Sequence, residues 1–155
     1  MVLRFSLKGG DCLGKLTKSI EIEASPEEVF NFINDAEKMN KAHEGVTEIE
    51  YTCKGPVGVG TTAHFVRKEG AFDAEITEFV KNKKVSWHTI GASKFKIALS
   101  FTLEPTTKGT KMTNSMDYEL PYSILGKLID KLSVSKNADK EATLWMENAK
   151  KALEA

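Results

Sequence analysis

The sequence predicts an α+β fold, in which a seven-stranded, curved antiparallel sheet is crossed on its concave face by one long C-terminal helix. Three observations support this prediction. Apolar and polar residues alternate through most of residues 46–120, short turn-forming sequences divide that region, and apolar residues recur every three or four positions after Pro121. A twisted sheet and an amphipathic helix can each bury an apolar face against the other, so one body is expected.

The chain opens with a strand and two short helices. Residues 16–24 alternate, with Leu16, Lys18, Ile20, Ile22 and Ala24 on one side, which is typical of a half-buried strand. The next residues, Ser-Pro-Glu-Glu at 25–28, predict a helix start with serine as N-cap, proline in the first turn and glutamate completing a capping box. A second short helix is expected at 36–43, and it ends near Gly45.

Six further strands are expected at about 46–54, 59–68, 71–81, 84–90, 94–104 and 109–119. The turns fall at 55–56, 69–70, 82–83, 91–93 and 106–109, where glycine, proline, asparagine or serine is present. Turns this short join neighbouring strands as antiparallel hairpins. With a two-residue turn at 82–83, Val80 faces Val85, Glu78 faces Trp87 and Ile76 faces Thr89.

Carrying this register through the other hairpins gives one apolar inner face and one polar outer face. Across the turn at 69–70, Ala63 is expected opposite Ile76, Phe65 opposite Ala74 and Arg67 opposite Phe72. The outer face, which belongs in water, collects Thr62, His64, Asp73, Glu75, Thr77, Ser86, His88, Lys96, Ser100, Lys111, Thr113, Asp117 and Glu119.

The final helix is expected from Pro121 to Ala155. Its apolar stripe comprises Tyr122, Leu125, Leu128, Ile129, Leu132, Met146, Ala149 and Leu153. The middle of this segment, residues 134–141, is poorer in bulky side chains. We therefore expect the helix either to bend there or to pass over something other than packed protein.

Composition limits the possible partners. The 155 residues suffice for one domain, expected at 15–155 after a leader at 1–14. The 22 basic and 22 acidic residues cancel, so no electrostatic feature favours nucleic acid or an anionic membrane surface. No apolar run reaches 18 residues and no signal peptide is visible, which predicts a cytoplasmic protein. Cys12 and Cys53 are expected to be free thiols, although a disulfide between them stays open, and the chain is expected to be a monomer without a cofactor.

An ordered set of local sequences resembles the START-like superfamily, also called SRPBCC, which includes birch-pollen-allergen-like proteins and the polyketide cyclase/dehydrase and lipid-transport family. The matching segments are residues 20–30 followed by Asp35, then 58–61, 76–79, 101–105 and 109–113, and the resemblance covers about residues 16–155. It implies a helix-grip fold, in which the long helix and the sheet enclose a hydrophobic ligand. These segments are cues to the fold and specify no substrate.

The expected inner face supplies the candidate ligand-binding residues. Its aromatic and methionine side chains suit an apolar guest of irregular shape. Arg67, Glu78 and Asn114 interrupt that face, and such polar groups need a partner because an unsatisfied buried one costs about 1–3 kcal/mol. The full candidate set is Ala63, Phe65, Arg67, Phe72, Ile76, Glu78, Trp87, Thr89, Phe95, Ile97, Leu99, Phe101, Met112, Asn114, Met116, Tyr118, Leu125, Ile129 and Leu132.

The main functional hypothesis is binding, and possible transport, of a small hydrophobic or amphipathic molecule such as a lipid, isoprenoid or polyketide-like compound. Two alternatives stay open. One is a cyclase/dehydrase-type enzyme in which Asn114, Glu78, Arg67 or Tyr118 orients a polyketide and moves protons. The other is a protein-interaction module. A competing interpretation is that the apolar residues simply fill the core, and that Arg67 and Glu78 reach solvent at the strand ends.

The sequence offers little support for metal or nucleophilic chemistry. His64 and His88 are expected on the outer face, opposite Glu75 and Thr77, and His43 is expected to be solvated. Two histidines without a third suitably placed ligand make a poor zinc site. The glycine-rich segment at 55–60 joins two strands and opens no helix, so it lacks the helix dipole of a phosphate-binding loop.

Overall fold

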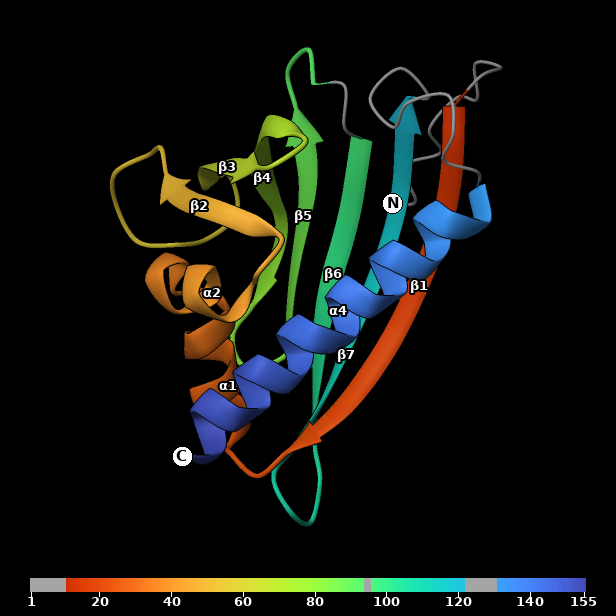
Figure 1. Ribbon diagram of the computed structural model, residues 1–155. Coiled ribbons are helices and arrows are strands. Elements are labelled where there is room, and N and C mark those ends of the chain that lie inside the picture. The colour runs from red at the N-terminus through yellow and green to blue at the C-terminus, as the bar shows by residue number, and fades with distance from the viewer. Residues whose placement is uncertain (1–10, 94–95, 122–130) are drawn as a thin grey trace.

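The protein folds around one curved sheet, which α4 crosses diagonally on the concave side (Figure 1). The computed structural model describes residues 11–93, 96–121 and 131–155. The elements are β1 (Asp11–Ile22), α1 (Pro26–Ile33), α2 (Ala36–Ala42), β2 (Val46–Tyr51), β3 (Thr62–Arg67), β4 (Gly70–Val80), β5 (Lys84–Ile90), β6 (Lys96–Pro105), β7 (Thr110–Pro121) and α4 (Lys131–Glu154).

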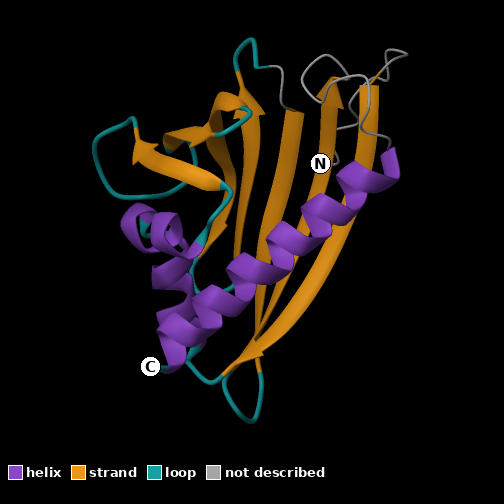
Figure 2. Ribbon diagram, in the orientation of Figure 1, coloured by secondary structure: helices purple, strands orange, loops and turns teal. Residues whose placement is uncertain are grey.

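The sheet has seven strands in the order β1-β7-β6-β5-β4-β3-β2, and each neighbouring pair is antiparallel. The first and last strands of the sequence, β1 and β7, lie side by side. The helices α1 and α2 connect β1, at one edge of the sheet, to β2 at the other edge. Figure 2 shows α1 and α2 beside the C-terminal end of α4. The predicted fold class is confirmed.

Several local predictions are confirmed as well. Glu28 N–H donates to Ser25 Oγ at 3.2 Å and Ser25 N–H donates to Glu28 Oε2 at 2.8 Å, which completes the capping box at the start of α1. The second helix, α2, is capped by Asp35, whose Oδ1 accepts from Lys38 N–H at 3.1 Å; this cap was not predicted from the sequence. The strand β1 begins at Asp11, four residues before the expected start of the domain.

The register of the β4–β5 hairpin differs from the prediction. The turn contains three residues, with Asn82 in the left-handed region at φ 60°, so Phe79 faces Val85 and Val80 faces Lys84. A bulge at Thr77 adds a second one-residue shift, which places Ile76 opposite Trp87. A shift of one residue moves every side chain to the opposite face of the sheet. Residues 78–80, between the turn and the bulge, carry one shift and lie on the face opposite to the expected one. Ile76, beyond the bulge, carries both shifts and keeps its expected inner face.

The prediction that Glu78 lies on the concave face is therefore wrong. It lies opposite Ser86 with its carboxylate 2.9 Å from Lys84 Nζ, away from the concave face. Val80 is 42% exposed, whereas Phe79 contacts Phe30 of α1 at a ring-centroid distance of 5.0 Å. Across β3 and β4 the register is shifted by two, so Ala63 faces Ala74 and Phe65 faces Phe72, and the expected faces are retained.

Two further expectations are corrected. Pro121 ends β7, where it pairs with Asp11, so it does not start the final helix. Glu119, expected in water, is only 2% exposed; it lies opposite Lys96 in the neighbouring strand, with Lys96 Nζ 3.8 Å from its carboxylate. An opposite charge directly across the sheet makes this burial tolerable. Tyr122, Leu125, Leu128 and Ile129 lie outside the described residues.

The core lies between the lower part of the sheet, α1 and the C-terminal half of α4. Its buried members come from all three and include Ile22, Val29, Phe30, Ile76, Val85, Leu103, Met112, Trp145, Met146 and Ala149. Within the described ranges, no helix combines the length and apolar character needed to cross a membrane. Cys53 is a free, exposed thiol.

Candidate functional site

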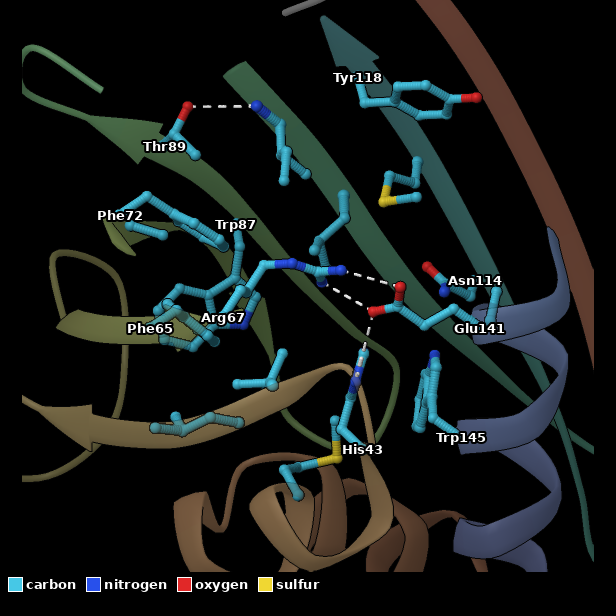
Figure 3. Close-up of a pocket in the computed structure, with 18 of the residues that line it drawn as sticks. His43, Phe65, Arg67, Phe72, Trp87, Thr89, Asn114, Tyr118, Glu141 and Trp145 are labelled. Carbon is cyan, nitrogen blue, oxygen red and sulfur yellow. Dashed lines mark hydrogen bonds and ion pairs between the residues drawn. The ribbon is translucent and has the colours of Figure 1, made fainter. Parts of the chain in front are cut away.

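A cavity of about 340 Å³ lies between the concave face of the sheet and the N-terminal half of α4. Strands β2 to β7, the helix α2 and the helix α4 all contribute side chains to it, and Figure 3 shows these side chains converging. The volume falls in the range of small-molecule sites, which are mostly apolar with a few polar groups. The lining follows that pattern.

Aromatic rings form one wall of the cavity. Phe65 and Phe72 stack at 5.1 Å between ring centroids, and Trp87 meets Phe65 edge to face at 5.8 Å. Tyr51 stacks on Trp87 at 6.3 Å, and its hydroxyl donates to the Asn34 carbonyl at 2.6 Å. These rings hold one another in place, so this wall is rigid and apolar.

Trp145 closes the other end of the cavity. Its ring meets Phe101 edge to face at 5.3 Å and stacks on His43 at 6.1 Å with an interplanar angle of 9°. Trp145 is 3% exposed. The helix α4 therefore rests directly on the sheet at this point, and the cavity begins on the N-terminal side of Trp145.

An ion pair spans the cavity between β3 and α4. Arg67 Nη1 and Nη2 donate to the two oxygens of Glu141 at 2.7 and 2.8 Å, and Figure 3 shows this paired contact. Burial opposes ionisation of Glu141, but the hydrogen bonds and charge of Arg67 outweigh it and lower the pKa of Glu141. Glu69 lies 3.4 Å from Arg67 Nε on the outer side of the pair.

His43 is buried beside this ion pair, and the expectation that it is solvated is wrong. Its Nδ1 lies 3.6 Å from Glu141 Oε1 and has no hydrogen-bond partner among the residues that the structure describes. Burial lowers the pKa of His43 to about 4; the Glu141 charge opposes that shift and the Arg67 charge adds to it. The imidazole is therefore neutral at pH 7.

The Glu141 carboxylate occupies the space where a side chain at position 45 would lie, and only glycine leaves that space free. A Cβ atom at position 45 would overlap Glu141 Oε1. The carboxylate cannot easily move aside, because Arg67 holds both of its oxygens. Gly14 has the same relation to Tyr118, whose ring fills the place of the missing side chain on β1.

Asn114 brings a polar group to the apolar floor of the cavity. It is 4% exposed and its Oδ1 has no hydrogen-bond partner in the part of the chain that the structure describes. It lies on β7 opposite Phe101 of β6, between Met112 and Met116 in sequence. A buried carbonyl oxygen in such surroundings needs a donor.

The structure brings together most of the candidate residues predicted from the sequence. Those that line the cavity are Phe65, Arg67, Phe72, Trp87, Thr89, Ile97, Leu99, Phe101, Asn114, Met116 and Tyr118. Ala63, Ile76 and Met112 are fully buried in the core beneath it, and Glu78 is turned away from it. Phe95, Leu125 and Ile129 lie outside the described residues, as does the side chain of Leu132.

Sequence reasoning missed the residues of α2, β2 and α4 that complete the cavity. The main ones are Met39, His43, Ile49, Tyr51, Asn137, Ala138, Glu141, Ala142 and Trp145. One signal is present in the sequence of α4: the segment 134–141 is poor in bulky side chains, and Asn137, Ala138 and Glu141 within it face the cavity. The burial of His43 depends on a tryptophan about 100 positions away, which no local pattern reveals.

The remaining histidines pair across strands. His64 Nδ1 lies 2.7 Å from Asp73 Oδ1, and His88 Nε2 lies 3.8 Å from Glu75 Oε2. Both partners differ from the expected ones because of the two-residue register shift. Among residues 11–93, 96–121 and 131–155, no group of three or more histidine, cysteine or acidic side chains is arranged to hold a metal ion.

Comparison with known proteins gives one family match. The model of the family described as polyketide cyclase/dehydrase and lipid transport matches residues 14–154. A protein of Streptomyces lincolnensis, described as an uncharacterized 17.2 kDa protein in the melC2-rnhH intergenic region, is 29% identical over 128 residues, which are 83% of each chain.

Solved structures with the same fold include a START superfamily protein from Mycobacterium smegmatis, with a TM-score of 0.74 and 15% identity over 90% of this chain and 97% of that one. The di-domain ARO/CYC StfQ from the steffimycin biosynthetic pathway has a similar structure, with a TM-score of 0.71 and 13% identity. That match covers 92% of this chain and 51% of StfQ. At these identities the likeness concerns the fold alone.

Proposed function

The chain belongs to the polyketide cyclase/dehydrase and lipid transport family, and we propose that it binds a small amphipathic molecule in the cavity beneath α4. The observation that carries the proposal is the cavity itself. The cavity has a volume of about 340 Å³ and is lined mainly by aromatic, aliphatic and methionine side chains. Protein interiors are normally close-packed, so a cavity of this size and lining favours the binding of an apolar group.

The shape of the lining agrees with an amphipathic ligand. The apolar part of the ligand would lie against Phe65, Phe72 and Trp87. Its polar part would lie near Glu141 and Asn114, toward α4 and β7, where the guanidinium of Arg67 reaches across from β3 (Figure 3). Apolar contact with the rings supplies affinity at roughly 25 cal/mol per Å² of buried surface. The few polar groups fix orientation.

Titration with a neutral fluorescent probe, N-phenyl-1-naphthylamine, tests the proposal. We expect saturable binding of one probe per chain, with the emission of a probe in an apolar environment. Ala138→Phe places a ring in the cavity and is expected to weaken binding at least tenfold. Val80→Ser is the control for adsorption to the surface, because Val80 is 42% exposed and lies on the other side of the sheet.

Absence of saturable binding would contradict the proposal. So would equal binding to the Ala138→Phe variant, because the probe would then occupy another part of the molecule. Loss of binding in Val80→Ser would point to the outer surface as the binding site.

Catalysis of the cyclase/dehydrase type is a second candidate function, favoured by one observation: His43 lies 3.6 Å from Glu141 inside the same cavity. A histidine whose pKa is about 4 is a weak base at neutral pH, and Arg67 already engages the carboxylate. Turnover of a polyketide-like substrate that His43→Phe abolishes, with binding retained, would establish this function in place of simple binding.

A further inference from the structure

The polar groups of the cavity define which ligands it can accept, and Asn114 is the most informative of them. Its carbonyl oxygen is buried and has no partner among the described residues, although the side chain lines the cavity. Phe101, opposite it on β6, offers no donor, and Lys18, opposite it on β1, is paired with Asp139 at 2.9 Å. A hydrogen-bond donor carried by a ligand would satisfy this oxygen, and a ligand without one would leave it unpaired.

The charged residues of the lining are already paired. Arg67 donates from Nη1 and Nη2 to Glu141 and lies with its Nε 3.4 Å from Glu69. Burial keeps His43 neutral, with its pKa at about 4, and His88 lies 3.8 Å from Glu75. Every basic side chain among the described lining residues therefore already has a carboxylate beside it, and none is left to pair with an anionic ligand.

Charge is expensive to bury without a partner, whereas a neutral hydroxyl needs only hydrogen bonds. We propose that the cavity selects an uncharged amphipathic ligand bearing a hydroxyl or N–H group, and that this group donates a hydrogen bond to Asn114 Oδ1. The inference rests on the proposed binding function and adds the chemical class of the ligand. Alcohols and phenols fit it; carboxylic acids, which are ionised at pH 7, do not.

A series of ligands with one shared ring system tests the inference. Naphthalene, 2-naphthol, 2-methoxynaphthalene, 2-naphthoate and protonated 2-naphthylmethylamine are compared at pH 7 by displacement of N-phenyl-1-naphthylamine. We expect 2-naphthol to bind about tenfold more tightly than naphthalene or the methyl ether, which is the gain from one hydrogen bond to a buried, otherwise unpaired acceptor. The carboxylate is expected to bind least tightly.

The variant Asn114→Leu keeps a side chain of similar size and removes the acceptor. We expect it to reduce the advantage of 2-naphthol over naphthalene to less than twofold while naphthalene itself binds nearly as before. An unchanged advantage in this variant would overturn the role of Asn114. The wild-type series decides the ligand class by itself if the variant fails to fold.

The outcomes separate this inference from the binding function. If the methyl ether or the carboxylate binds as tightly as 2-naphthol, the inference is overturned and the binding function stands. If protonated 2-naphthylmethylamine binds most tightly, the requirement for an uncharged ligand is overturned. If none of the compounds displaces the probe and the probe itself does not bind, the proposed function fails together with the inference.

Discussion

The two halves of α4 meet the same sheet in different ways. In the C-terminal half, Trp145, Met146 and Ala149 are at most 3% exposed and are packed against the sheet and α1. In the N-terminal half, Asn137, Ala138 and Glu141 face the cavity. The C-terminal half of this helix is therefore part of the core, and its N-terminal half covers the cavity.

The difference follows from side-chain size along one stripe of the helix. Positions 138, 142, 145 and 149 are spaced by four, three and four residues, so they share a face. Trp145 reaches Phe101 on the sheet, whereas Ala138 and Ala142 are too short to fill the space between helix and strands. Two alanines on this face therefore leave a cavity between the helix and the strands.

Removing the tryptophan is expected to give the largest loss of stability. Trp145→Ala should lower the free energy of unfolding by about 3–5 kcal/mol, because it leaves a void in the packed half. Asn137→Ala, in the half over the cavity, should change it by less than about 0.5 kcal/mol. Urea denaturation of both variants measures the contrast. A cost below about 1 kcal/mol for Trp145→Ala would show that the C-terminal half is not packed as described.

Replacing an alanine by phenylalanine in each half of α4 is a complementary test, because it adds volume instead of removing it. Ala149 is fully buried, so Ala149→Phe should destabilise the protein by about 3 kcal/mol through overpacking. Ala138→Phe should leave stability within about 0.5 kcal/mol or raise it, because the ring enters the cavity. Thermal denaturation of the pair measures this. Equal destabilisation would mean that α4 is seated on the sheet along its whole length.

The ion pair that spans the cavity is expected to act as a unit. Glu141→Leu or Arg67→Leu alone should cost about 2–3 kcal/mol, because each leaves a partly buried charge without its bidentate partner. The double variant should cost less than the sum of the two, since no unpaired charge is left. Unfolding of all four proteins forms the double-mutant cycle. Additive losses would show that the two side chains do not interact in solution.

The burial of His43 predicts a dependence of stability on pH. Its pKa is about 4 in the folded protein and about 6.5 when unfolded, so only the unfolded chain gains this proton as the pH falls from 6.5 to 4. Stability attributable to His43 is therefore complete above pH 6.5 and is lost by about 2 kcal/mol between pH 7 and 5.

Urea denaturation at both pH values checks this expectation. His43→Phe should show a smaller difference between pH 7 and 5 than the wild type. The control Val80→Ser, which alters an exposed side chain that does not titrate, should retain the wild-type difference. An equal pH dependence in His43→Phe and the wild type would contradict the burial of this histidine.

Local patterns predicted the strands, the capping box at Ser25 and most of the concave face. They succeeded because a register error of two residues, as between β3 and β4, leaves each side chain on its face. They failed at Glu78, because the turn at 81–83 has three residues instead of two and reverses the faces of residues 78–80, and the bulge at Thr77 then restores the expected face for Ile76. The positions of His43 and Glu141 depend on contacts between segments far apart in the chain, which periodicity does not describe.

The most direct test of the unequal halves is an NMR measurement with alanine methyl groups labelled and N-phenyl-1-naphthylamine bound. We predict intermolecular NOEs from the probe to the methyl groups of Ala138 and Ala142 and none to that of Ala149. NOEs to Ala149, or no NOE to either Ala138 or Ala142 in the saturated complex, would contradict a ligand cavity beneath the N-terminal half of α4.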